Sequence, residues 1–129
     1  MNRLTKFLCT ASLVLPLSAA FATPEYLTTE NRTNATTKAY LFGQLPPQHP
    51  VKPGKTYHLP WSKIKMLCIG LKTCHATIKM SGDPTKPETE VGSLKLEIET
   101  GIITPAIIIN NGYKVEVVDI AHIVISEIN

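Results

Sequence analysis

Two cysteines separated by five residues are the side chains best suited to covalent chemistry in this chain. They are Cys68 and Cys74. Alternating apolar residues predict that segments 62–69 and 73–80 are neighbouring strands, with both cysteines on the core face and Gly70 in the turn between them. Directly opposed residues of antiparallel strands have Cα atoms about 4.5–5.5 Å apart, which is within disulfide range. The spacing therefore predicts one disulfide, Cys68–Cys74.

Soft ligands near the same cysteines indicate a second chemistry, the binding of copper. Met66 and Met80 are expected on the strand face that carries the cysteines, and His75 follows Cys74 directly. Thiolate and thioether sulfur atoms suit Cu(I). Alternating Met and Cys are also ordinary core residues, and a disulfide removes both thiolates. A periplasmic copper-handling protein is therefore the alternative function, and no metal site is predicted in the first interpretation.

Basic side chains gather in the first half of the chain that follows residue 22. Residues 23–80 hold eight Lys and Arg against two Asp and Glu, whereas residues 81–129 hold three against eight. A charge dipole of this kind draws a partner of opposite charge to one side first. The side chains expected to face solvent together are Lys52, Lys55, His58, Lys63 and Lys65. They form the predicted contact region for an acidic protein or glycan.

Catalytic and cofactor motifs do not stand out in the sequence. The histidines after residue 22 show no HExxH or H-x-H spacing, and no serine lies in a GxSxG motif. His122 is expected to be partly buried and bonded to a backbone carbonyl. Glu97 and Glu99 share one strand face, where they are expected to be solvated rather than paired for glycoside hydrolysis. We therefore expect no enzyme activity, no cofactor and no nucleic-acid ligand.

The first 22 residues have the layout of a secretory signal peptide. Arg3 and Lys6 precede an uncharged run that ends in the small-x-small pattern of residues 20–22. This run is shorter than the roughly 20 apolar residues that cross a bilayer. We predict that residues 1–22 are removed on export and that residues 23–129 form one periplasmic or extracellular domain without stable membrane insertion. Such a compartment is oxidising, which agrees with the disulfide.

Alternation with a period of two recurs along the rest of the chain. In segment 91–100, for example, Leu94, Leu96 and Ile98 share one face. Asn111-Gly112 is a strong hairpin signal, and segment 120–126 is apolar on both faces, as in a central strand. The predicted strands are 36–43, 55–61, 62–69, 73–80, 91–100, 106–110, 113–118 and 120–126.

About seven or eight short strands predict an all-β fold, an antiparallel β-sandwich of immunoglobulin-like type with one disulfide. A small closed barrel is the alternative fold. The features together predict an exported, non-enzymatic protein that acts by binding a protein or glycan partner. A competing contact region is Ile107-Ile108-Ile109, because an edge strand of this composition invites pairing with another chain.

Overall fold

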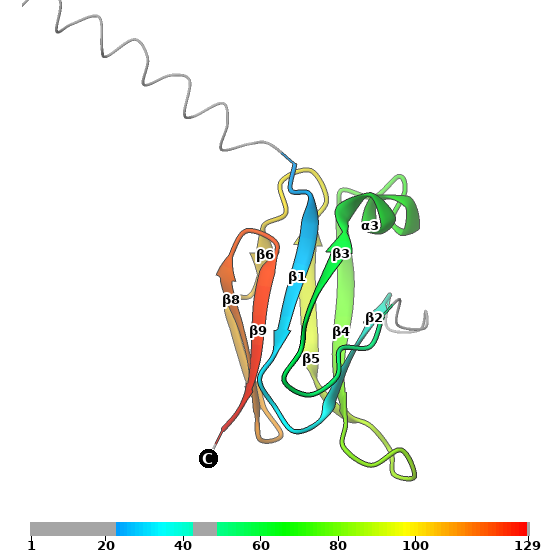
Figure 1. Ribbon diagram of the computed structural model, residues 1–129. Helices are drawn as coiled ribbons and strands as arrows, with labels where there is room; N and C mark the ends of the chain where they lie inside the picture. The colour runs from blue at the N-terminus through cyan, green and yellow to red at the C-terminus, as the bar shows by residue number, and fades with distance from the viewer. Residues whose placement is uncertain (1–22, 43–48, 129) are drawn as a thin grey trace, which may run out of the picture.

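The computed structural model describes residues 23–42 and 49–128. The predicted signal peptide, residues 1–22, lies outside the described residues. Within them the chain folds into nine strands and one short helix (Figure 1). In chain order the elements are β1 (Tyr26–Asn31), β2 (Thr36–Leu41), β3 (Thr56–Pro60), α3 (Trp61–Leu67), β4 (Thr73–Ser81), β5 (Thr89–Glu97), β6 (Ile103–Thr104), β7 (Ile107–Asn110), β8 (Tyr113–Asp119) and β9 (His122–Glu127).

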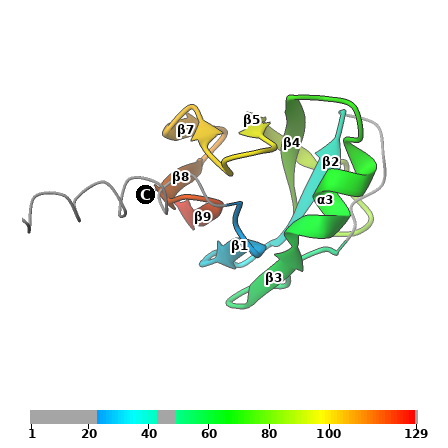
Figure 2. The ribbon, with the colours of Figure 1, turned by 90° about the horizontal axis from the view of Figure 1, so that it is seen from above.

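The strands form two sheets that pack face to face. The five-stranded sheet has the order β3-β1-β9-β8-β7, and the four-stranded sheet has the order β2-β4-β5-β6. Paired strands are antiparallel except for β1 and β9, which are parallel. Seen from above, the sheets lie side by side, and α3 lies between β3 of one sheet and β2 and β4 of the other (Figure 2). The predicted all-β sandwich is confirmed.

The alternating residues predicted for the core are buried. Along most of β4 and β5 every second side chain lies inside the sandwich, and β8 and β9 supply the opposing layer from the other sheet. The largest buried side chains of these strands are Ile78, Met80, Leu94, Leu96, Val115 and Ile125. Full burial of one such side chain is worth about 1.5–3 kcal/mol relative to exposure, so this core provides the main driving force for folding.

The C-terminal part of the chain forms the predicted hairpin and central strand. Asn111 and Gly112 join β7 to β8 with φ values of 51° and 86°. Positive φ at both central residues gives a two-residue turn the twist that its flanking strands require. The next strand, β9, lies in the middle of the five-stranded sheet, and Ile123, Val124 and Ile125 are all buried. Both predictions are confirmed.

The predicted strand 62–69 is wrong, because the structure has the helix α3 there. Trp61, Ile64 and Cys68 are each only 1% exposed, and spacings of three and four residues place them on one side of a helix. Over so short a segment an alternating pattern suits a strand equally well. Met66 favours the helix, since it is 68% exposed, whereas the strand would place it in the core.

In the described part of the chain no helix is long and apolar enough to cross a membrane.

The strand β1 has no counterpart among the predicted strands, because its sequence is mostly polar. It is nonetheless an interior strand, paired with β3 on one side and β9 on the other. Its last residue, Asn31, is 1% exposed, and its side-chain amide donates hydrogen bonds to the carbonyls of Ala35 (2.7 Å) and Val51 (2.9 Å). Backbone pairing and buried hydrogen bonds, more than apolar alternation, therefore hold β1 in place.

Candidate functional site

Cys68 and Cys74 form the predicted disulfide, with Cα atoms 6.1 Å apart. Cys68 follows the last residue of α3, and Cys74 lies near the start of β4, so the bond joins a helix to a strand. The predicted strand-to-strand register around the pair is therefore wrong, although the pairing itself is confirmed. The bond closes the short turn that carries Ile69 and Leu71.

The five residues of the predicted basic contact region are all exposed, but they fall into two groups. Lys52 and Lys55 precede β3, and His58 lies within it. Lys63 and Lys65 lie in α3, beyond the other end of β3 (Figure 1). A strand of this length spans roughly 16 Å, which separates the groups. Because residues two apart on a helix do not face each other, the two α3 lysines also lack the shared face predicted for a strand.

An open hollow lies beside the first of these groups, and we call it the β3 hollow. Its volume is about 170 Å³. Its lining residues are His49, Pro50, Val51, Lys52, Lys55, Thr56 and Tyr57. The rings of His49 and Tyr57 stack, with centroids 3.7 Å and planes 6° apart. The hollow thus combines an aromatic pair with two ammonium groups at an edge of the five-stranded sheet.

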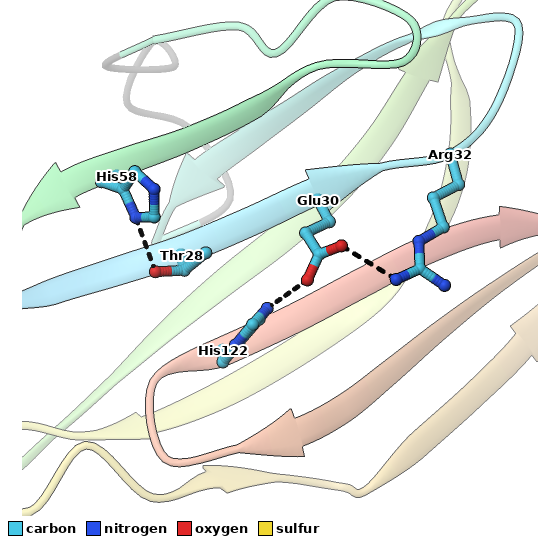
Figure 3. Close-up of polar contacts among 5 residues, drawn as sticks. All are labelled: Thr28, Glu30, Arg32, His58 and His122. Carbon is cyan, nitrogen blue, oxygen red and sulfur yellow. Dashed lines mark hydrogen bonds and ion pairs between the residues drawn. The ribbon is translucent and has the colours of Figure 1, made fainter.

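A second polar group, the sheet-face cluster, consists of Thr28, Glu30, Arg32, His58 and His122 (Figure 3). Strand register places His58, Thr28 and His122 in one row across β3, β1 and β9. The hydroxyl of Thr28 lies 2.9 Å from Nδ1 of His58. Glu30 accepts hydrogen bonds from Nε2 of His122 at 2.5 Å and from Nη2 of Arg32 at 2.9 Å.

His122 is partly buried as predicted, but its predicted carbonyl partner is wrong. Its side chain is 30% exposed and bonds to the carboxylate of Glu30. Hydrogen bonds from His122 and then from Arg32 lower the pKa of Glu30 below its ordinary value. The sequence pattern could not reveal this pair, because β1 was not among the predicted strands and nothing placed Glu30 beside β9.

The residues of the copper alternative do not converge. Both cysteines are in the disulfide, and Met66 points to solvent. Met80 is buried toward the other end of β4, where its sulfur accepts a hydrogen bond from the hydroxyl of Thr37 at 3.2 Å. Within residues 23–42 and 49–128, no group of three or more His, Cys, Asp and Glu side chains is placed to hold a metal ion.

The space between the two sheets is small. A cavity of about 60 Å³ lies there, with Leu27, Leu41 and Ile78 among its lining residues. Sites for drug-sized ligands measure about 300–1,000 Å³. The β3 hollow is larger but also below this range, and it shares His49, Val51 and Tyr57 with the cavity. It opens to solvent beside two lysines, so we take it as the candidate site for surface contact rather than for an enclosed ligand.

Comparison with known proteins places this fold in a family. A family model described as the type II secretion system (T2SS) substrate NttC matches residues 1–128. The chain belongs to the NttC family. It is similar to the solved structure of the type II secretion system substrate NttC of Legionella pneumophila. The two share 31% sequence identity with a TM-score of 0.74, over 81% of this chain and 98% of that chain. Among curated proteins, none matches the chain.

Membership of the NttC family makes this a secreted protein, exported from the cytoplasm. The predicted export from the cytoplasm is confirmed. Disulfides form and persist outside the cytoplasm, so the Cys68–Cys74 bond fits this destination. The NttC structure also supports the sandwich fold found here.

Proposed function

We propose that this secreted protein is a non-enzymatic binding module for an acidic protein or glycan, and that the β3 hollow is the centre of its contact surface. Lys52 and Lys55 line this centre, whereas His58 lies on the outer face of β3. Lys63 and Lys65 form an outlying basic pair at the far end of β3. The observation that carries the proposal is the placement of two exposed lysines beside the stacked rings of the β3 hollow.

The charge distribution of the chain supports an acidic partner. Between Glu30 and Asp83 the sequence contains no acidic residue. Lysine ammonium groups at an exposed edge attract a partner over distance and mainly raise the association rate, an effect that salt screens over about 8–10 Å. The aromatic pair adds a flat surface on which a sugar ring or a side chain can pack.

The sheet-face cluster lies on the outer face of the sheet, whereas Tyr57 of the β3 hollow points to the other face of β3. His58 belongs to β3 and bonds to Thr28 of β1, so polar side chains continue from the edge strand across the outer face of the sheet. The ring of Tyr26 lies edge-on to that of His58, with centroids 5.9 Å apart. A glycan bound on this outer face would meet hydroxyl, imidazole and aromatic groups.

Chromatography on immobilised heparin and on immobilised poly-glutamate tests the proposal. We expect Lys52→Glu/Lys55→Glu to elute at clearly lower salt than the wild type on at least one probe. The matched control is Lys86→Glu/Lys95→Glu, which reverses two exposed lysines elsewhere and gives the same net charge. Equal weakening by both pairs would show a general charge effect and contradict the proposed site.

We also propose that residues 1–22 are a signal peptide and that the mature protein acts in the periplasm or outside the cell. The basis is the basic start and the apolar run of this segment. Intact mass of the exported protein from its host is expected to match a chain that begins at Thr23. Exported material that retains Met1 would contradict the cleavage.

A further inference from the structure

The end of α3 and the turn after it expose a group of apolar side chains. Ile69 and Met66 are 81% and 68% exposed, the highest values among the large apolar residues of the described chain, and Leu71 is 45% exposed. Single exposed apolar residues are common on protein surfaces, whereas a contiguous group is a feature of contact sites. We call this group the α3 tip, formed by Met66, Ile69 and Leu71 together with Lys63, Lys65 and Lys72.

Helix geometry places lysines beside the apolar side chain of α3. Successive residues of a helix are rotated by about 100° around its axis. Since Trp61 and Ile64 face the core, Met66 points almost directly away from it. Lys63 and Lys65 then lie on either side of Met66. An exposed thioether is thus flanked by two ammonium groups.

The turn that follows α3 holds Ile69 outward. The amide of Leu71 donates a hydrogen bond to the carbonyl of Cys68 at 3.0 Å, which closes a tight turn with Ile69 and Gly70 at its corners. Gly70 has a φ of 82°, a conformation that glycine adopts without strain. The disulfide to Cys74 joins the base of the turn to β4. The tip therefore lies at one end of the sandwich (Figure 1), where the disulfide braces it.

The charged side chains of α3 and of the turn after it are all positive, and the acidic residues beside them, Glu25, Glu97 and Glu99, belong to other segments. Lys72 follows Leu71 directly and is exposed, as are Lys63 and Lys65. The segment from Trp61 to Met80 contains four lysines and no acidic residue. A surface that binds the α3 tip must therefore accommodate aliphatic side chains and carry negative charge around them.

We propose that the α3 tip docks onto the surface of a lipid bilayer that contains anionic lipids. Its aliphatic side chains enter the boundary between headgroups and acyl chains, while the lysines remain at the level of the phosphates. Protein interfaces concentrate their binding energy in Trp, Tyr and Arg, and the tip exposes none of these. The inference goes beyond the proposed function, because the partner is a lipid surface and the residues that carry it lie outside the β3 hollow.

Sedimentation with vesicles tests this docking, using the exported protein in the form that its host releases. We expect the wild type to bind vesicles of phosphatidylcholine mixed with phosphatidylglycerol more strongly than vesicles of phosphatidylcholine alone. Ile69→Ser is expected to lower the partition coefficient about tenfold, because one large apolar contact is lost. Thermal unfolding should show that this exposed substitution leaves the fold intact.

Ile109→Ser is the matched apolar control. Ile109 is 65% exposed on β7, at the opposite edge of the five-stranded sheet from β3. We expect this variant to bind vesicles as the wild type does. Absence of wild-type binding to the mixed vesicles, or an equal loss in Ile109→Ser, would overturn the docking proposal.

Charge reversals separate this proposal from the proposed function. Lys63→Glu/Lys65→Glu is expected to weaken binding to the anionic vesicles. Lys52→Glu/Lys55→Glu is expected to reduce retention on heparin and to weaken vesicle binding clearly less than Lys63→Glu/Lys65→Glu, which changes the net charge equally. If Ile69→Ser weakened heparin retention as much as vesicle binding, the tip would be a site for an acidic macromolecule, and lipid docking would be wrong.

Discussion

Glu30 is one residue at which charge and stability are linked in this protein. Hydrogen bonds from His122 and then Arg32 lower the pKa of its carboxyl group below the ordinary value of 4.5. A carboxylate with a lower pKa in the folded than in the unfolded chain stabilises the fold above its unfolded pKa. That contribution is lost as the pH falls through the folded pKa. The sheet-face cluster is therefore expected to weaken in acid.

Replacing Glu30 by Gln tests this linkage. We expect Glu30→Gln to lower the midpoint of thermal unfolding at neutral pH, because the charge-assisted hydrogen bonds to His122 and Arg32 are lost. The difference from the wild type should shrink as the pH falls from 4.5 through the lowered pKa of the folded carboxyl group. Glu25→Gln, at an exposed position, serves as the control. A difference that stays constant down to acid pH would show that the carboxylate charge is not responsible.

At the scale of elements, the sequence predicts those strands whose inward side chains alternate strictly. β4 and β5 lie where the alternation places them, and the hairpin after β7 follows from the φ requirements of Asn111 and Gly112. The pattern does not predict β1, because the inward positions of this strand carry polar as well as apolar residues. The pattern predicts a strand in place of α3, because seven residues fit a period of two and a period of 3.6 equally well.

The sheet-face cluster depends on pairing between distant segments, whereas the β3 hollow is formed within residues 49–57. The exposed lysines and the disulfide pair can be found from residue type and spacing. The pair of Glu30 with His122 arises only once β1 and β9 are placed beside each other, and the stack of His49 on Tyr57 depends on how the chain turns back before β3. The prediction that Lys63 lies beside the lysines before β3 is wrong, because α3 begins where β3 ends and carries Lys63 away from them.

The helical form of α3 makes a prediction that contrasts two neighbouring side chains. Ile64→Ala removes a side chain that is 1% exposed, and such a core truncation costs about 2–5 kcal/mol of unfolding free energy. Met66→Ala removes an exposed side chain and should change stability by less than about 0.5 kcal/mol. Urea unfolding of the two variants measures both values. A large loss for Met66→Ala would support the strand that places Met66 in the core.

At the scale of the whole molecule, the β3 hollow and β7 lie at opposite edges of the five-stranded sheet. β3 and the lysines before it form one edge, and β7 forms the other. On β7, Ile107 and Ile109 are 50% and 65% exposed, so they are the side chains available to another chain. Ile108 instead packs over Gly92, where an added Cβ would lie 3.0 Å from the Ile108 side chain. The separation allows one mapping experiment to distinguish the regions.

Amide chemical shifts recorded during titration with a heparin-derived oligosaccharide test the central claim, which is binding at the β3 hollow. We expect the largest saturable shifts at Lys52, Lys55, Tyr57 and His58, with amplitudes that fall as salt is added. β7 should remain unshifted. Shifts confined to β7, or no saturable shift around the β3 hollow, would contradict the claim.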